Sequence, residues 1–236
     1  MSVYAGPEIV SDGLINLYDA ANAKSYNSSN TTQWIDILGN GTNFTIYGSP
    51  TYDVNGFFTF STNQTTQYMM AENFPFTTND HTMIYWFRPT NMGTAGSTDQ
   101  TPVTYAISTD TNYMLMLSVS GGTTFRVYRS TLHDLTAPNM SNKWNMFTRT
   151  RIRSSGVENY YMDGQFVGTR TIDVNGASVS GGKLIIGQEM DNYTTNSFDS
   201  NQNLDGSFSF FSMYNRALTN DEILQNYNAL RGRYGL

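Results

Sequence analysis

The densest run of oxygen-bearing side chains lies between residues 191 and 206. Calcium takes roughly six to eight oxygen ligands from carboxylates, amide carbonyls and the backbone, and this run supplies a candidate set. The candidate calcium ligands are Asp191, Asp199, Asn201, Asn203 and Asp205. The run is not an EF-hand loop, because Leu204 stands where that loop needs its glycine. The alternative interpretation is a loop of Asx-turns, which Asn and Asp form readily.

Aromatic side chains next to planar amides form a second group that could bind a ligand. Ring faces cover the apolar side of a sugar, and amides exchange hydrogen bonds with its hydroxyl groups. The candidate carbohydrate-binding residues, which we place in loops, are Tyr105, Asn112, Tyr113, Gln188, Asn192, Tyr193 and Phe198. For each of them the alternative is a structural position on a sheet, because aromatic residues have high strand propensity.

Two segments are candidates for contact with a partner. Arg149, Arg151 and Arg153 alternate along an expected strand and would project from one face of it. Such a stripe could clamp an acidic partner or polysaccharide, or form the solvated face of an edge strand, where charge discourages stray pairing. Residues 1–12 would be either a docking arm or a first edge strand. The residues through which that arm would dock are Val3, Tyr4 and Ile9.

The composition excludes several classes of partner and site. The 236 residues carry a net charge of −6, and only 14% of them are charged. A duplex-binding protein neutralises many phosphates with Lys and Arg, so we expect no nucleic-acid partner. No apolar run reaches the ~18 residues of a membrane span, so we expect no membrane insertion. The chain has no cysteine and two histidines, which excludes thiolate catalysis and a closed zinc site.

Short runs rich in β-branched and aromatic residues recur about every ten residues, which predicts an all-β sandwich. The predicted strands are 14–18, 44–47, 57–60, 67–70, 82–88, 103–108, 113–118, 124–128, 144–152, 158–162, 165–170, 183–187 and 206–214. Asp163-Gly164 predicts a tight hairpin between two of them. Thr219 with Glu222 forms a capping box that predicts one helix over 219–231. No linker or internal repeat divides the chain, so we expect one domain over 1–236.

Several segments, in order along the chain, resemble the laminin-G-type domains of the concanavalin A-like superfamily. The resemblance lies in Thr82–Pro89, Trp144–Thr148, Tyr160–Gly168, Ile186–Gly187, Leu204–Phe208, Met213–Thr219 and Asp221–Ile223. It implies an all-β jelly-roll sandwich of two antiparallel sheets with one short C-terminal helix, with sugar binding in many members and often calcium. One departure is that Phe60-Ser61-Thr62 and Gln67-Tyr68-Met69 lack the acidic residues that many members carry there, which weakens the case for a site at that edge.

The ends of the chain narrow the resemblance. Asp12–Asn22, Trp34–Gly41 and Asn226–Leu236 are similar to the laminin-G-like domains of tailed-bacteriophage virion proteins. This similarity implies a place on the virion surface, with other virion proteins, such as major capsid, fibre or baseplate subunits, as partners. It also implies host or environmental glycans as ligands and leaves a homo-oligomer open. The chain begins without the basic and apolar regions of a secretory signal, so we expect synthesis in the host cytoplasm without a signal peptide.

A glycoside hydrolase of the same fold is the enzymatic alternative. Such enzymes carry an ExDxxE strand, and the nearest string here, Glu189 to Thr194, lacks the last acidic residue. A retaining pair needs carboxyl groups about 5 Å apart, a geometry open to Glu189 and Asp191 at i and i+2. His81 and His133 have no nucleophile pattern around them. We therefore expect a non-enzymatic virion surface protein, a capsid decoration or fibre-type subunit, that binds glycans; a decoration protein without a ligand is the further alternative.

Overall fold

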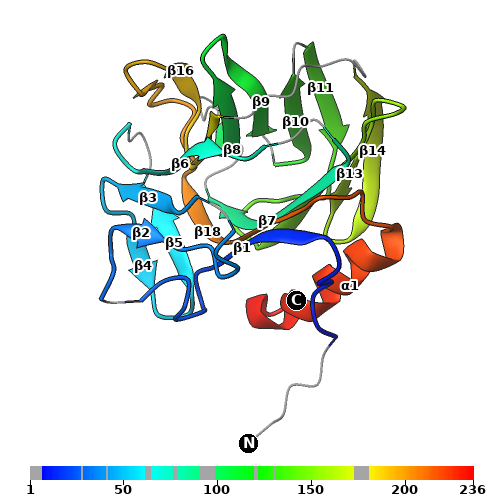
Figure 1. Ribbon diagram of the computed structural model, residues 1–236, viewed down its shortest axis with the longest axis horizontal. Helices are drawn as coiled ribbons and strands as arrows, with labels where there is room; N and C mark the ends of the chain where they lie inside the picture. The colour runs from blue at the N-terminus through cyan, green and yellow to red at the C-terminus, as the bar shows by residue number, and fades with distance from the viewer. Residues whose placement is uncertain are drawn as a thin grey trace, which may run out of the picture.

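Two antiparallel sheets of eight strands face each other and form a sandwich (Figure 1). The computed structural model describes residues 7–27, 29–40, 42–61, 65–76, 79–90, 99–119, 122–129, 131–172 and 181–236, without the side chains of 112 and 115–119. All pairings between its named strands are antiparallel. The prediction of a two-sheet sandwich is therefore confirmed.

The first sheet has the strand order β14-β13-β12-β7-β18-β5-β4, and β1 pairs with β18 beside this path. Its strands are β1 (Leu14–Asp19), β4 (Thr51–Asp53), β5 (Phe57–Phe60), β7 (His81–Pro89), β12 (Asn145–Ile152), β13 (Val157–Met162), β14 (Gln165–Thr171) and β18 (Gly206–Tyr214). Asp163 and Gly164 join β13 to β14 with φ of 52° and 78°. Both values are positive, as a type I′ turn requires, so the predicted hairpin is confirmed.

The second sheet has the order β11-β10-β9-β8-β15-β6-β3-β2. Its strands are β2 (Gln33–Trp34), β3 (Phe44–Tyr47), β6 (Tyr68–Phe74), β8 (Gln100–Ile107), β9 (Asp110–Val119), β10 (Thr124–Arg129), β11 (Thr131–Thr136) and β15 (Gly182–Ile186). A separate hairpin of β16 (Met190–Asn192) and β17 (Ser197–Phe198) packs on its outer face, where Met190 and Phe198 contact Met70 and Ile185. Sheet order thus brings this late hairpin close to β9.

The central strand β7 shows how the layers are filled. Tyr85 and Phe87 belong to the core between the sheets, whereas Ile84 and Trp86 belong to the cluster under the C-terminal helix. Both faces of β7 are therefore covered, which explains why the strand reads as nearly continuous apolar sequence rather than as an alternation. Burying each such side chain contributes about 1.5–3 kcal/mol.

The helix α1 (Asn220–Leu230) lies on the outer side of the first sheet, followed by the short helix η1 (Arg231–Tyr234) (Figure 1). Thr219 caps α1: its Oγ1 accepts the Glu222 amide at 3.3 Å, and the Glu222 carboxylate accepts the Thr219 amide at 2.8 Å. The Arg216 guanidinium donates two hydrogen bonds to the same carboxylate, at 2.6 and 2.8 Å. These hydrogen bonds, from the Arg216 guanidinium first, lower the pKa of Glu222 to about 2. The predicted capping box is confirmed.

The N-terminal segment differs from the prediction. Residues 7–12 form no strand; instead the Val10 amide donates to Asn226 Oδ1 at 2.8 Å, and the Val10 carbonyl accepts from Tyr214 at 2.9 Å. Ile9 packs on the cluster under α1. The described part of the arm is therefore docked on this chain's own helix, and no edge strand forms over residues 7–12. Val3 and Tyr4 lie outside the described residues.

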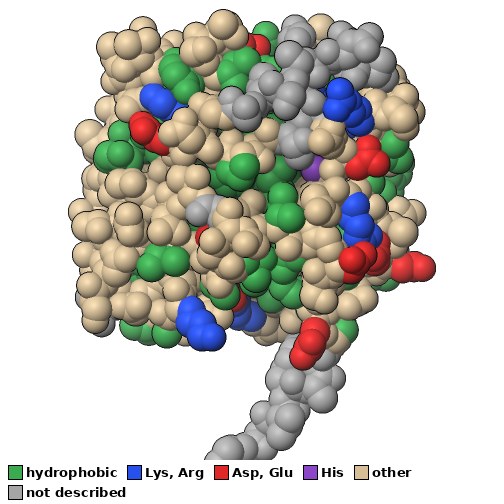
Figure 2. Space-filling model, in the orientation of Figure 1, with side chains coloured by type: hydrophobic (Ala, Val, Ile, Leu, Met, Phe, Trp, Pro, Cys, Tyr) green, Lys and Arg blue, Asp and Glu red, His purple; other side chains and the backbone are tan. Residues whose placement is uncertain are grey.

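The surface carries few charges, which are scattered among uncharged polar side chains (Figure 2). Within the described ranges no helix is long and apolar enough to cross a bilayer. Contacts of this surface will therefore depend mainly on hydrogen bonds and shape rather than on long-range charge.

Candidate functional site

An open groove of about 450 Å³ lies between the turn that joins β8 to β9 and the hairpin that begins with β16. Ligand sites commonly have volumes of roughly 300–1,000 Å³, so a small molecule or one or two sugar rings would fit. The groove is lined by Ser108, Thr109, Asp110, Thr111, Asp191, Asn192, Tyr193 and Thr194. Its lining is thus made of hydroxyl groups, two carboxylates, one amide and one aromatic ring.

The β16 side of the groove is fixed by local hydrogen bonds. Asn192 Oδ1 accepts the amides of Thr194 and Thr195 at 2.9 and 3.0 Å, which is an Asx-turn. Tyr193 donates its hydroxyl to the Gly181 carbonyl at 3.1 Å. Because these bonds hold the turn, Asp191 and Thr194 are presented to solvent on a defined backbone.

Lys183 on β15 supports the same turn from below. Its Nζ donates to the Tyr193 carbonyl at 2.8 Å and to Asn196 Oδ1 at 2.6 Å, and it lies 4.3 Å from the centre of the Tyr193 ring. A cation over a ring face adds an attraction of about 0.5–1 kcal/mol at partly exposed sites. The ring of Tyr193 is therefore held in place before any ligand arrives.

The structure brings only some of the predicted carbohydrate-binding residues together. Asn192 and Tyr193 line the groove, and the Asn112 side chain lies outside the described residues. Phe198 packs instead on Tyr68, with ring centres 4.4 Å apart. Tyr113 is half-buried and accepts a hydrogen bond from Arg129 at 2.5 Å.

Tyr105 on β8, Tyr113 on β9 and Phe198 on β17 are strand residues, so their predicted place in loops is wrong, whereas Gln188 lies in the connection between β15 and β16. Tyr105 lies on β8 inside the core, where it stacks on Phe76 at 4.6 Å and accepts the Gly182 amide at 3.0 Å. Burial raises its pKa to about 12. Gln188 is fully buried, and its carbonyl accepts from Thr104 at 2.9 Å. High strand propensity, the alternative for each aromatic candidate, explains the position of Tyr105.

The candidate calcium residues are dispersed over their loop. Within the described part of the chain no three His, Cys, Asp or Glu gather, so Asp191, Asp199 and Asp205 do not form one acidic set. Asp199 makes an Asx-turn, accepting the Asn201 amide at 2.8 Å. Asn203 is buried and donates to the Ser61 carbonyl at 2.8 Å. The Asx-turn alternative holds at Asp199, and calcium binding stays a prediction.

Glu189 and Asp191 occupy different environments. Glu189 is buried, with 4% of its surface exposed, whereas Asp191 is exposed at the groove. A retaining glycosidase needs both carboxyl groups to face the same sugar ring. The hydrolase alternative therefore stays a prediction without support from this pair.

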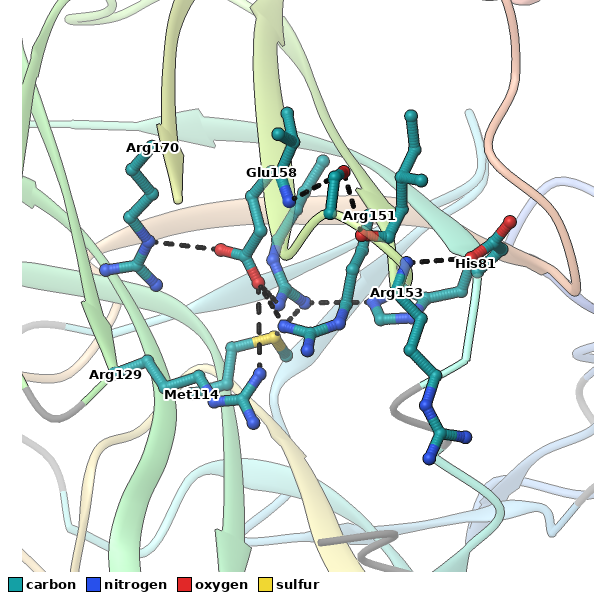
Figure 3. A network of polar contacts seen from close by, with 12 residues as sticks. His81, Met114, Arg129, Arg151, Arg153, Glu158 and Arg170 are labelled. Atoms are coloured by element: carbon teal, nitrogen blue, oxygen red, sulfur yellow. Dashed lines mark hydrogen bonds and ion pairs between the residues drawn. The ribbon is translucent and has the colours of Figure 1, made fainter. Parts of the chain in front are cut away.

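The arginine stripe does not lie on a solvated edge. β12 lies between β7 and β13, and Arg149 and Arg151 are 1% and 0% exposed because their side chains enter the interior. Arg153 is exposed, its amide donates to Asp80 Oδ1 at 2.8 Å, and its side chain runs away from the interior (Figure 3). The prediction of a solvated edge is wrong, and a partner-binding role for the stripe stays a prediction.

Sequence reasoning missed the β8–β9 side of the groove and the partners of the buried arginines. Ser108 to Thr111 form a polar hairpin tip whose turn composition was visible, but its contact with residues 191–194 depends on sheet order. Glu158 lies directly opposite Arg151 in the β12–β13 register. A hairpin centred on residues 154–155 places these two residues opposite each other, so the hairpin could have predicted the pair from the sequence.

Comparison with known families and structures adds to this geometry. A family model described as the concanavalin A-like lectin/glucanases superfamily matches residues 62–224. A search of curated protein sequences finds no match to the chain. The family match covers the strands that form both sides of the groove.

Three solved structures share the fold. A heptameric SAP-like pentraxin from Limulus polyphemus aligns with a TM-score of 0.59 and 18% identity, over 74% of this chain and 82% of its own. A Trypanosoma rangeli sialidase in complex with sialic acid aligns with a TM-score of 0.70 and 12% identity, over 99% of this chain and 36% of its own. The receptor-binding domain of botulinum neurotoxin type G aligns with a TM-score of 0.65 and 13% identity, over 92% of this chain and 51% of its own. At such identities the likeness shows the fold alone.

Proposed function

The chain belongs to the concanavalin A-like lectin/glucanase superfamily, and on that premise we propose that it is a non-enzymatic carbohydrate-binding protein whose site is the groove between the β8–β9 turn and β16. The observation that carries this proposal is the groove itself. It combines a fixed aromatic ring with hydrogen-bonding groups from two separate turns. Such a combination suits a ligand that has an apolar ring face and a rim of hydroxyl groups.

The charge of the groove favours a neutral sugar. Asp110 and Asp191 line the groove and would accept hydrogen bonds from sugar hydroxyl groups, and charge-assisted bonds of this kind are stronger than neutral ones. Asn192 is exposed and uses its Oδ1 within the turn, so its amide N–H groups remain as donors for a ligand. Two carboxylates would repel an anionic ligand. The proposed ligand is therefore a neutral, hydroxyl-rich glycan.

Binding without hydrolysis is proposed because Glu189 is buried away from exposed Asp191. A hydrolase would release reducing sugar from a bound polysaccharide and lose that activity in Glu189→Gln. Sustained product release by the wild-type chain, absent in this variant, would overturn the non-enzymatic part of the proposal.

A glycan array followed by calorimetric titration of the bound glycans tests the site. Tyr193→Ala and Asp191→Asn should each weaken binding about tenfold or more, because each removes a ring face or a charged acceptor. Phe166→Ala is the matched control, since Phe166 is 55% exposed on β14 of the other sheet. Binding that survives in both groove variants, or no binding to any neutral glycan, contradicts the proposal.

We also propose that copies of the chain sit on the surface of a phage particle, as the similarity of its terminal motifs suggests. Many copies on one particle raise the effective concentration, so weak single sites can suffice. Mass spectrometry of purified particles should find the chain together with capsid, fibre or baseplate proteins, and its absence would contradict this setting. Calcium is a candidate cofactor of the loop 191–206; unchanged glycan binding after EDTA treatment would remove it from the proposal.

A further inference from the structure

Four arginines and one glutamate meet in the interior, between the strand pairs β12–β13 and β9–β10 (Figure 3). Glu158 on β13 is fully buried. The arginines that form ion pairs with it are Arg129 on β10, Arg149 and Arg151 on β12, and Arg170 on β14. We refer to these five residues as the arginine cluster.

The Glu158 carboxylate is fully used by its neighbours. Its Oε1 accepts from Arg149 and, at 3.3 Å, from Arg151 Nη1. Its Oε2 accepts from Arg170 Nε at 3.1 Å and from the Tyr160 hydroxyl at 2.5 Å. The Arg129 guanidinium approaches only to 3.9 Å. One carboxylate thus orients the arginines but has no acceptor capacity left for Arg129.

The cluster contains more positive than negative charge. Arginine stays protonated in proteins, so four guanidinium groups face one carboxylate within these five residues. His81 lies 3.1 Å from Arg149, but burial, with the Arg149 charge adding to it, lowers its pKa to about 3, so it is neutral. Buried charge without a partner is strongly unfavourable. Burial accordingly lowers the pKa of Arg129.

The guanidinium groups at the outer side of the cluster have donors to spare. An arginine offers five N–H donors, yet among the described residues Arg129 donates one hydrogen bond, to Tyr113, and Arg170 two, to Glu158 and the Thr131 carbonyl. Deeper in the cluster, Arg149 Nε is buried without a partner. The unused hydrogen-bonding capacity and the uncompensated charge therefore lie in the same place.

Exposure shows where a ligand would enter. The side chains of Arg149 and Arg151 are 1% and 0% exposed, whereas those of Arg129 and Arg170 are 9% and 8% exposed. Both lie on the side of Glu158 away from His81 (Figure 3). Arg170 Nη1 reaches the Thr131 carbonyl at 3.4 Å, so the more exposed side of the cluster lies where β14 meets β11.

We propose that the arginine cluster is an anion-binding site that takes one oxyanion group, a sulfate, phosphate or carboxylate, between Arg129 and Arg170. Guanidinium forks match the geometry of such groups and bind them in a bidentate way. Glu158 positions the arginines, and the anion neutralises charge that Glu158 leaves unbalanced. The oxyanion comes either from a free inorganic ion or from the acidic group of a sugar. The inference goes beyond the proposed function, because the groove and the cluster share no lining residue.

Calorimetric titration of the full chain with sodium sulfate, against sodium chloride at matched ionic strength, tests the site. We expect one sulfate per chain and a thermal midpoint raised by about 3–6 °C at ten times the dissociation constant. Arg129→Gln and Arg170→Gln should each weaken sulfate binding at least tenfold. Arg126→Gln is the matched control, because Arg126 lies on the same strand and pairs with Asp134 at 2.6 Å on the surface.

Two outcomes would overturn the proposal. Sulfate at high concentration stabilises proteins in general, so an equal response in the wild type and both cluster variants overturns it, as does the absence of a saturable heat in the wild type. The wild-type titration decides alone if a variant does not fold, as judged by near-ultraviolet circular dichroism. Glucuronate and neutral glucose then separate the two sources: glucuronate binding that requires Arg129 identifies an acidic sugar, and sulfate binding alone identifies an inorganic ion. Sulfate and glucuronate binding at the cluster should be independent of the groove, so Tyr193→Ala should leave sulfate binding unchanged.

Discussion

The two ends of the interior are filled by opposite chemistry. Between the strands β1–β5 and β18, on the left of Figure 1, rings pack against rings: Phe44 lies 4.8 Å from Tyr18, 5.8 Å from Trp34 and 6.1 Å from Phe211. Between β9–β10 and β12–β14, on the right, the same two sheets enclose the arginine cluster. One sandwich therefore has an apolar end and a charged end.

The two ends should respond differently to pH and salt. Ring packing depends on buried area and shape, which change little with pH or salt near room temperature. A buried ionic network depends on every partner being present, and loss of one partner exposes the desolvation cost of the rest. Stability of the charged end should thus vary with pH and anions, while the aromatic end should not.

Glu158→Gln should destabilise the protein most. This change removes the one negative charge of the arginine cluster and leaves four buried guanidinium groups together. Breaking a buried ion pair costs about 3–5 kcal/mol, so the free energy of unfolding in urea at pH 7 should fall by that amount.

The matched control for this change is Glu72→Gln. The Glu72 side chain is 57% exposed and lies 4.0 Å from Lys183 Nζ, so its loss should cost about 0–1 kcal/mol. If the two variants were equally stable, the buried Glu158 would contribute no more than an exposed carboxylate, and the prediction for the charged end would be wrong.

His81→Gln tests the pH dependence of the charged end. Burial, with the Arg149 and Arg151 charges adding to it, lowers the pKa of His81 from 6.5 to about 3, although the Glu158 charge acts in the opposite direction. The unfolded chain therefore binds a proton below pH 6.5 while the folded chain does not, and stability falls as pH falls from 6.5 toward 3. At pH 5 the loss is about 2 kcal/mol.

Urea titrations at pH 7 and pH 5 check this expectation. Carboxylates with ordinary pKa values remain mostly ionised in that interval, so the histidine dominates the change. The His81→Gln variant should lose about 2 kcal/mol less than the wild type between the two pH values, whatever its absolute stability. If the wild type and the variant lost the same stability between pH 7 and pH 5, His81 would take up its proton in the folded protein as it does in the unfolded chain.

Local patterns predicted most of the fold because their causes are local. The strands Phe44–Tyr47, Phe57–Phe60 and Gly206–Tyr214 have the predicted bounds, since β-branched and aromatic runs end at turn residues. The strand Thr131–Thr136 was missed. It is an edge strand with mostly exposed residues, so no apolar alternation marks it, and its pairing with β10 alone makes it a strand.

The sites were harder to predict, because alternation along a strand identifies residues that share a face but not which face is buried. Both interpretations of the stripe Arg149, Arg151 and Arg153, a clamp for an acidic partner and a solvated edge, place it at the surface, which is the usual position of arginine. Sheet order decides otherwise, since it places Arg170 and Glu158 from neighbouring strands against the first two. The groove depends in the same way on β9 meeting β16, which follows it about 80 residues later, and of its lining residues the sequence singled out Asp191, Asn192 and Tyr193.

The smallest expected effect is at the aromatic end, in Phe44→Leu. Phe44 is fully buried among Tyr18, Trp34 and Phe211, and a smaller hydrophobe should cost about 1–2 kcal/mol, less than the full cavity left by alanine. The same loss is expected at pH 5 and pH 7, and with sulfate or chloride at equal ionic strength, because the ring contacts of Phe44 within the described part of the chain are with other aromatic rings. A loss that varied with pH or anion would mean that the two ends are coupled through the shared sheets. The two ends would then differ in composition but not in how their stability responds to pH and anions.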